Sequence, residues 1–281
     1  MKNRTIEGQA VVVRRQQSRG WAPIDLEELW QYRELLWFYA VRDIKVRYKQ
    51  TFLGAAWAIL QPVMTMVVFS IFFGNLAGVP SDDVPYPIFT FCALLPWQLF
   101  AYALTNSSNS LVDNASVLTK VYFPRLVLPI AAVIAGLVDF VIAFAVLIAM
   151  MAYYGIYPGV AVITLPLFVI LAVAAALAVG FWLSALNVRY RDVKYTIPFL
   201  SQLWLFSTPV AYPTSIVPSE WQVIYGINPM AGVVEGFRWA LLGSGQPPGP
   251  LLAMSAAATT ALLIGGLFYF RRMERSFADI I

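Results

Sequence analysis

The hydrophobic positions of the chain form long uncharged runs that are separated by short polar connectors. The clearest boundary follows residues 42–49, which hold four Lys and Arg, because the charge stops at Thr51 and stays absent through Phe73. A run of about 20 apolar residues is long enough to cross a bilayer as a helix. Since flanking Lys and Arg favour the cytoplasmic side, this junction predicts where the membrane begins and the direction in which the chain enters it.

The same pattern predicts six membrane-crossing helices. They cover residues 52–73, 84–104, 126–154, 160–186, 195–210 and 251–270. The fifth run is short and contains Pro198 and Pro209. Residues 214–242, between the fifth and sixth runs, are apolar in patches but broken by prolines and glycines. We expect two short re-entrant helices there, an arrangement that is tolerated at membrane depth only where protein or water surrounds it.

Residues 25–49 precede the first crossing and show the spacing of an amphipathic helix. Asp25 and Glu28 form a plausible capping pair, and Leu29, Trp30, Leu36 and Trp37 recur at helical intervals. A helix rich in Trp and Tyr is suited to the inner membrane interface, although a small cytoplasmic packing helix is the alternative. The organisation expected is therefore a polar cytoplasmic tail (1–24), an interfacial helix (25–49) and a six-span membrane domain (50–281).

The positive charges test this topology. Eighteen of the nineteen Lys and Arg fall on the side assigned to the cytoplasm, and Arg238 is the exception. A wrong number of crossings would scatter them over both faces. The sequence thus predicts an all-α, multi-pass membrane protein with both termini in the cytoplasm.

Composition supports the same class. The chain is 60% hydrophobic and 12% charged, with a mean hydropathy of +0.70, whereas soluble domains are about 25% charged. The net charge of +4 follows from membrane orientation, so we expect no nucleic-acid partner. There is no histidine and only one cysteine, Cys92, which argues against a metal centre, a hydrolytic site and an intrachain disulfide.

No phosphate-binding loop is present, since none of the five lysines follows a glycine. We therefore expect no ATPase site, catalytic residue or bound cofactor on this chain. Asp139 is the only ionisable residue deep within a predicted crossing, which is weak support for a proton relay. An actively driven transporter of this composition needs an external energy source. A membrane-embedded enzyme of glycolipid synthesis and a passive channel are the alternatives from other classes, and the missing histidine and carboxylate clusters argue against the enzyme.

Four segments in order carry a family resemblance: RDIKVRYKQTFLGAAWAILQP (42–62), FPRLVLP (123–129), NVRYRD (187–192) and INPM (227–230). From about residue 30 to its end, the chain resembles the permease subunits of bacterial ABC exporters for polysaccharides. The resemblance implies an inner-membrane homodimer with a channel at its interface, joined by two copies of a separate P-loop ATPase that binds ATP and Mg²⁺. The implied cargo is a lipid-linked surface polysaccharide such as O-antigen, and teichoic acid, capsular polymer, a drug or a small lipid are the alternatives.

The resemblance also suggests roles for three groups of residues. Connectors that dock on the ATPase would use Asp113, Lys120, Arg125, Arg189, Arg191, Asp192 and Lys194. The alternative is that the five cations among them serve only as topology anchors. An external gate would pair Arg238 with Glu220 or Glu235, and the alternative is an ordinary surface ion pair between them. Since sugar rings stack on aromatic faces, the substrate path is predicted to include Tyr48, Trp57, Trp97, Phe100, Tyr102 and Asp139. The simpler interpretation is that the aromatic rings contact membrane lipids at the interface and that Asp139 has a paired structural role.

Overall fold

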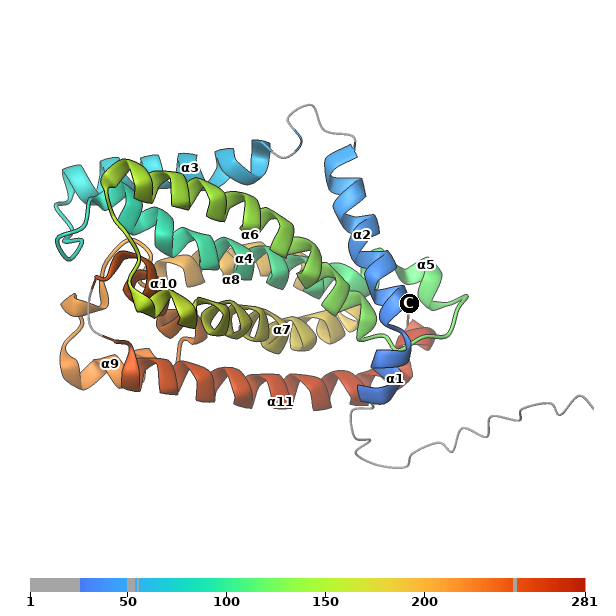
Figure 1. The fold of residues 1–281 in the computed structure, drawn as a ribbon. Coiled ribbons are helices and arrows are strands. Elements are labelled where there is room, and N and C mark those ends of the chain that lie inside the picture. Colours follow the sequence, from blue (N-terminus) through green and yellow to red (C-terminus); the bar gives the residue numbers. More distant parts are fainter. Residues whose placement is uncertain (1–25, 50–53, 55, 245–246, 281) are drawn as a thin grey trace, which may run out of the picture.

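The computed structural model describes residues 26–49, 54, 56–244 and 247–280, and in these ranges the chain is helical with no strand (Figure 1). The predicted tail (1–24) and Asp25 lie outside the described residues. The elements in order are α1 (Leu26–Gln31), α2 (Arg33–Lys49), α3 (Ala56–Phe69), η1 (Ser70–Leu76), α4 (Tyr86–Asp113), α5 (Ala115–Leu118), α6 (Val127–Tyr154), η2 (Val160–Thr164), α7 (Leu165–Arg189), α8 (Val193–Ser207), η3 (Thr214–Ile216), α9 (Ser219–Tyr225), α10 (Pro229–Leu242) and α11 (Gly249–Ile280).

Five helical segments are long and apolar enough to cross a membrane. They are Ala56–Leu76, Tyr86–Asp113, Val127–Tyr154, Val160–Arg189 and Gly249–Glu274. These five agree with five of the six predicted runs. The remaining run forms α8, whose 15 residues extend about 22 Å at 1.5 Å per residue. That is shorter than the hydrocarbon core of about 30 Å, so a crossing by residues 195–210 stays a prediction.

The long helices lie roughly along one another, and the charged connectors gather at one end (Figure 1). We call this the basic end: it comprises α1, α2, α5, the connectors at 119–126 and 190–192, and the C-terminal part of α11. The opposite end holds the connectors at 77–85 and 155–159 together with α9.

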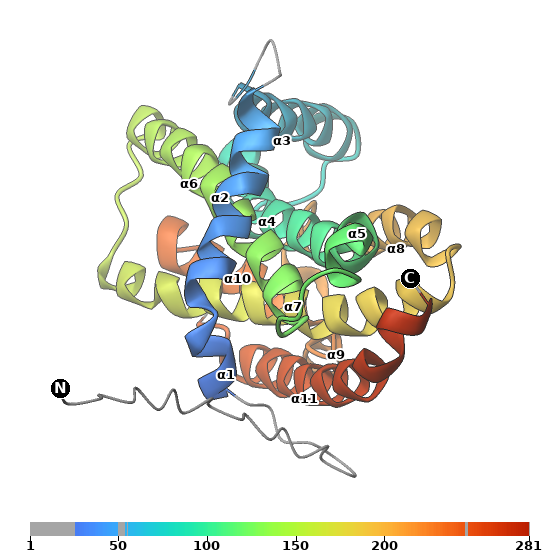
Figure 2. The ribbon, with the colours of Figure 1, turned by 90° about the vertical axis from the view of Figure 1, so that its right-hand side faces the viewer.

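The predicted interfacial helix is divided into α1 and α2, with Tyr32 between them. Figure 2 shows α2 crossing the bundle at the basic end, where it packs against α6. Tyr39 and Ala40 are buried in this contact, whereas Trp30, Trp37 and Phe38 are exposed. An inner face against protein and an outer aromatic face suit a helix at a membrane interface.

Helix α4 lies at the centre of the bundle and contacts α6, α7 and α10. Its contact with α7 depends on small residues: Ala172, Ala175, Ala176 and Gly180 are all buried. A Cβ on Gly180 would lie 2.2 Å from Ser107 Oγ and 3.2 Å from Ser107 Cβ, so any larger residue there would require Ser107 to shift. Close approach of helices through small residues is typical of membrane proteins, in which lipid supplies no hydrophobic drive for helices to associate.

The polar stretch at residues 106–110 remains helical, although the predicted apolar run ended near Leu104. The hydroxyls of Ser107 and Ser110 donate to the carbonyls of Leu104 and Ser107 in their own helix. Both serines are buried. Local hydrogen bonding of this kind lets small polar side chains lie inside a helix bundle.

Two short helices, α9 and α10, occupy the segment for which two were predicted. Twelve of the 14 residues of α10 are buried, and its neighbours are α4, α7 and α11. Asn228 caps its start by accepting from Met230 N at 3.0 Å, and Ser255 Oγ of α11 accepts from Gly232 N at 3.1 Å. The protein therefore surrounds α10, as a re-entrant helix requires.

Candidate functional site

One face of α4 carries a row of polar side chains. Gln98, Tyr102, Asn106, Asn109 and Asp113 recur every three or four residues, so they share a face of the helix. None of them is buried, although 78% of the apolar part of α4 is buried, more than in any other candidate crossing. We call this row the α4 polar stripe. Because polar groups facing lipid are unfavourable, this stripe is suited to meet water or protein.

Hydrogen bonds along the stripe hold its amide donors. Asn106 Nδ2 donates to the carbonyl of Tyr102 at 2.8 Å, and Asn109 Nδ2 donates to that of Thr105 at 2.9 Å. From α7, Asn187 Nδ2 donates to Asn109 Oδ1 at 3.0 Å and to the Ser108 carbonyl at 3.1 Å. Asn106 and Asn109 can thus be present at membrane depth with a hydrogen bond from each amide group already made. The polarity of residues 106–110 is visible in the sequence, but neither Asn106 nor Asn109 was predicted to be a site residue.

A charged cluster lies beside the stripe, where α2, α4 and α6 meet. Arg47 Nη2 lies 2.6 Å from Asp139 Oδ2, and the Tyr48 hydroxyl donates to Asp139 Oδ1. The Arg47 guanidinium also lies 4.4 Å from the centre of the Tyr102 ring. Burial, and then the hydrogen bond to Asp139, raise the pKa of Tyr48, which keeps its hydroxyl protonated as the donor. We call these four residues the Asp139 cluster.

The structure therefore brings together three of the six predicted path residues, Tyr48, Tyr102 and Asp139. Arg47 was not among those candidates, although its place in the basic run before the first crossing signalled a charge near the membrane. Gly136 permits the cluster, because a Cβ there would lie 2.5 Å from Tyr102 Cδ1.

The other three predicted path residues lie elsewhere. Trp57 is half exposed near the start of α3. Trp97 and Phe100 are buried in the core, with their ring centres 5.3 Å apart, and Phe100 also contacts the Trp204 ring at 5.0 Å. In the described chain these two rings pack in the interior and do not lie on an open surface. Because α4 is buried around most of its circumference, the spacing of its residues could not reveal which rings are exposed.

The predicted ATPase contacts gather at the basic end. Lys120, Arg189, Arg191, Asp192 and Lys194 are exposed there. Lys194 Nζ lies 3.7 Å from Asp113 Oδ1, and both side chains are more than half exposed. The backbone N–H of Arg125 donates to Glu274 Oε1 at 3.1 Å, which ties this connector to α11. Glu274, which also pairs with Arg271 at 3.2 Å, was not singled out from sequence.

At the opposite end, Arg238 and Glu235 are 1% and 5% exposed and lie 3.7 Å apart. The Arg238 guanidinium donates to the carbonyls of Val210 and Tyr212, at 2.7 and 3.2 Å, and to that of Phe89 at 3.4 Å. It also lies 3.6 Å from the Phe89 ring centre. Glu220, the third predicted gate residue, is exposed on α9, and no described hydrogen bond or ion pair joins it to the other two.

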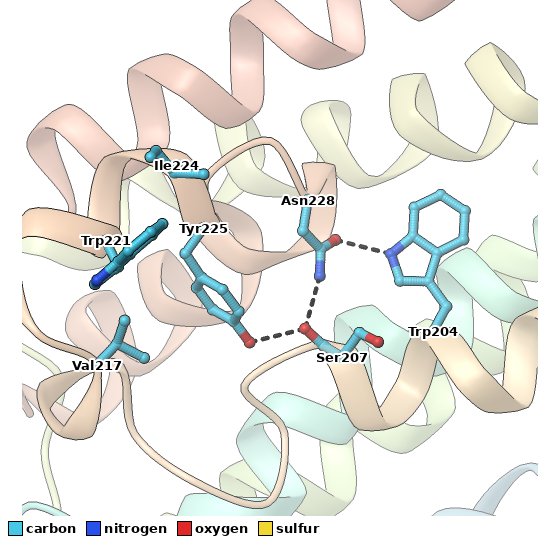
Figure 3. Close-up of a pocket in the computed structure, with 7 residues that line it drawn as sticks. All are labelled: Trp204, Ser207, Val217, Trp221, Ile224, Tyr225 and Asn228. Carbon is cyan, nitrogen blue, oxygen red and sulfur yellow. Dashed lines mark hydrogen bonds between the residues drawn. The ribbon is translucent and has the colours of Figure 1, made fainter.

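A pocket of about 500 Å³ opens between α8 and α9 (Figure 3). Its lining residues are Trp204, Ser207, Val217, Trp221, Ile224, Tyr225 and Asn228. Trp204 Nε1 donates to Asn228 Oδ1 at 2.9 Å, and Tyr225 Oη and Asn228 Nδ2 donate to the Ser207 carbonyl at 2.8 and 3.1 Å. Because these polar groups bond one another, the aromatic rings of Trp204, Trp221 and Tyr225 supply much of the pocket lining. Apart from the proline-broken segment at residues 214–242, no sequence pattern predicts this pocket.

No group of three or more His, Cys, Asp or Glu able to hold a metal ion occurs among the residues that the structure describes.

A family model described as ABC-2 type transporter matches residues 34–242. The chain is 32% identical over 259 residues to the O-antigen export system permease protein of Myxococcus xanthus, covering 91% of this chain and 98% of that protein. A Klebsiella pneumoniae protein of the same name is 28% identical, covering 88% and 95%. The polysialic acid transport protein of Escherichia coli is 25% identical, covering 84% and 92%.

Proposed function

Because this chain belongs to the ABC-2 type transporter family, we propose that it is the membrane subunit through which a bacterial exporter moves a lipid-linked surface polysaccharide across the inner membrane. In this proposal two copies of the chain form the conduit, and two copies of a separate P-loop ATPase supply the energy.

The α4 polar stripe is the observation that carries the proposal. A polysaccharide is rich in hydroxyl groups, which need hydrogen-bonding partners or water throughout a passage across hydrocarbon. Gln98, Asn106 and Asn109 supply such groups on the partly exposed face of a central helix that is otherwise largely buried. The names of the relatives, which specify O-antigen and polysialic acid, support a sugar polymer as cargo. Teichoic acid, capsular polymer, a drug or a small lipid are the other cargoes within the same transporter class.

A single chain leaves the stripe open on one side, which supports a homodimer. Helices α3 and α8 flank α4 (Figure 2). Their exposed large apolar side chains include Trp57, Met64 and Val68 on α3, and Tyr195, Phe199, Leu203 and Phe206 on α8, and Phe72 on η1 continues the α3 set. Two copies related by twofold symmetry could join these apolar edges and enclose two polar stripes. Membrane lipids would cover the remaining apolar surface.

The absence of a phosphate-binding loop in the sequence means that ATP and Mg²⁺ would be held by the partner. The exposed residues of the basic end, Asp113, Lys120, Arg189, Arg191, Asp192 and Lys194, offer a surface for that subunit. Arg125 is held closer to the bundle, through Glu274.

Co-purification tests the assembly. We expect the tagged chain, co-expressed with a candidate P-loop ATPase, to form a complex with two copies of each subunit, as measured by native mass spectrometry. In lipid nanodiscs, lipid-linked O-antigen should stimulate ATP hydrolysis by this complex. A complex whose ATPase lacks its P-loop lysine is the control. Failure of every P-loop ATPase to bind contradicts the proposal, as does a complex whose hydrolysis responds to no glycolipid.

A further inference from the structure

We propose that the Asp139 cluster is the joint through which movement of α2 reaches the α4 polar stripe. Asp139 would then be a positioning residue that acts through Arg47 and does not contact cargo. This inference rests on the proposed function, because it assigns a route for the force that an ATPase delivers at the basic end.

Both oxygens of Asp139 are engaged by α2. Oδ2 lies 2.6 Å from Arg47 Nη2, and Oδ1 accepts from the Tyr48 hydroxyl. The Asp139 side chain is only 18% exposed. A carboxylate with both oxygens bonded, one to a cation, is poorly available to the hydroxyl groups of a passing sugar. Its partners therefore assign it to the contact between helices.

The positions of Arg47, Tyr48 and Asp139 allow this contact to transmit movement from α2 to α6. Arg47 and Tyr48 belong to the last turn of α2, and Asp139 lies 12 residues into α6. Farther back on α2, Tyr39 and Ala40 pack in the apolar cluster of the basic end. Apolar packing is non-directional, whereas a charge-assisted hydrogen bond fixes distance and angle. The end of α2 is thus held to α6 by directional bonds.

The same guanidinium reaches the stripe. Arg47 lies over the ring of Tyr102, a member of the α4 polar stripe, and that ring packs against Gly136, three residues before Asp139 in α6. A shift of α2 that preserves the Arg47–Asp139 pair must carry α6 with it, and it also moves the group that covers Tyr102. Asp139 is mostly buried, so leaving its carboxylate without the Arg47 cation would be unfavourable. The ion pair should therefore persist as α2 moves.

Matched substitutions test this joint in the complex of chain and ATPase. R47Q and D139N each remove one member of the ion pair, and the double variant R47Q/D139N removes both charges. K49Q is the control, because it removes a positive charge from the same turn of α2 at an exposed position. Two readouts apply: hydrogen exchange of the α2 amides, and ATP hydrolysis stimulated by lipid-linked polysaccharide.

We expect R47Q and D139N to speed exchange in α2 and to lower the stimulated hydrolysis by about 5- to 150-fold, the range of typical coupling between sites. K49Q should change neither quantity. The double variant should be no worse than either single variant, because it leaves no unpaired charge. If D139N does not fold, Y48F removes only one hydrogen bond and should still speed exchange in α2.

The inference is overturned if D139N lowers stimulated hydrolysis while R47Q does not, since Asp139 would then act on cargo. Unchanged exchange of α2 in both single variants overturns it as well. Exchange measured on the isolated chain separates this inference from the proposed function. If D139N speeds exchange of the α2 amides there while no P-loop ATPase binds the chain, the proposed function fails and the anchoring of α2 by Asp139 stands.

Discussion

At the residue scale, Arg238 illustrates how a buried cation can organise irregular backbone. Helix α8 ends at Ser207, and the following loop must satisfy its carbonyls without helical partners. Arg238 donates to two of them, at Val210 and Tyr212, and to Phe89 on α4. The residue that broke the charge pattern of the sequence is therefore held inside the protein, where its donors bond backbone and its charge faces Glu235.

We expect R238M to destabilise the protein by about 3–5 kcal/mol, because it leaves the Glu235 carboxylate buried without its cation. Thermal unfolding in detergent measures this loss. E220Q, at an exposed position, should shift the midpoint little. If R238M unfolds at the wild-type temperature, the stabilising role of this guanidinium is wrong.

Asn106 tests whether the stripe serves transport or only packing. The side chain is partly exposed, and its donor already bonds its own helix. We expect N106L to keep the unfolding temperature and to lower glycolipid-stimulated ATP hydrolysis, because the path loses a polar group.

The matched control for N106L is T260L. Thr260 is exposed on α11, and its hydroxyl likewise bonds its own helix, at Ala256. We expect T260L to leave hydrolysis unchanged. Equal effects of the two variants would remove the special role of the stripe.

At the element scale, the contact between α4 and α7 depends on the absence of side-chain volume. Ser107 fills the space above Gly180, so each helix is shaped by the other. The hydrophobic run of α7 predicted a crossing helix, but its position against α4 follows from small residues whose partners lie some 70 residues away in sequence. Hydropathy therefore identified the element, and only packing identified its neighbour.

G180A should destabilise the bundle by about 1–3 kcal/mol, the usual cost of added volume in a packed interior. The second substitution S107A, which removes the hydroxyl that the new methyl group would meet, should recover part of this loss. G159A is the control, since no atom lies within 4 Å of a Cβ built there. Thermal unfolding of G180A, S107A, the double variant G180A/S107A and G159A measures the coupling between positions 107 and 180. Additive effects of G180A and S107A would contradict a direct contact between the two residues.

At the scale of the whole molecule, the bundle separates two chemically different ends. Exposed cations gather at the basic end, whereas the one cation at the opposite end, within the described part of the chain, is the buried Arg238. Such asymmetry orients a membrane protein with its basic loops in the cytoplasm. Helix α8 is too short to cross the membrane alone, so labelling experiments are needed to show whether the chain crosses five or six times.

Single cysteines in a C92A background test the orientation. Cys92 is fully buried, so it can be replaced by a small apolar residue, and the exposed Arg191 and Tyr157 lie at the basic and the opposite end. We expect a membrane-impermeant maleimide to label Y157C in intact spheroplasts, and R191C only after lysis. Labelling of both positions from one side would contradict the predicted topology.

The sequence by itself determined the class of the protein, five of its crossing helices, the short helices before the last of them and the family to which it belongs. Chain-local signals suffice for these features, since the length of an apolar run and the residues that flank it decide whether a segment enters a bilayer. Features that depend on contacts between distant segments were predicted only in part. The polarity of residues 106–110 was visible in the sequence, but the arrangement of these residues in a partly exposed stripe on α4 was not.

Tertiary structure alone decided which side chains meet. It placed Asp139 against Arg47 and Tyr48, 92 and 91 positions away, and it buried Trp97 and Phe100, which share a helix with the open stripe. The physical reason is that most faces of a crossing helix are apolar, so hydropathy cannot tell which of them packs against protein and which faces lipid. That choice depends on the fit between side chains from several helices, and it exists only once the bundle has formed.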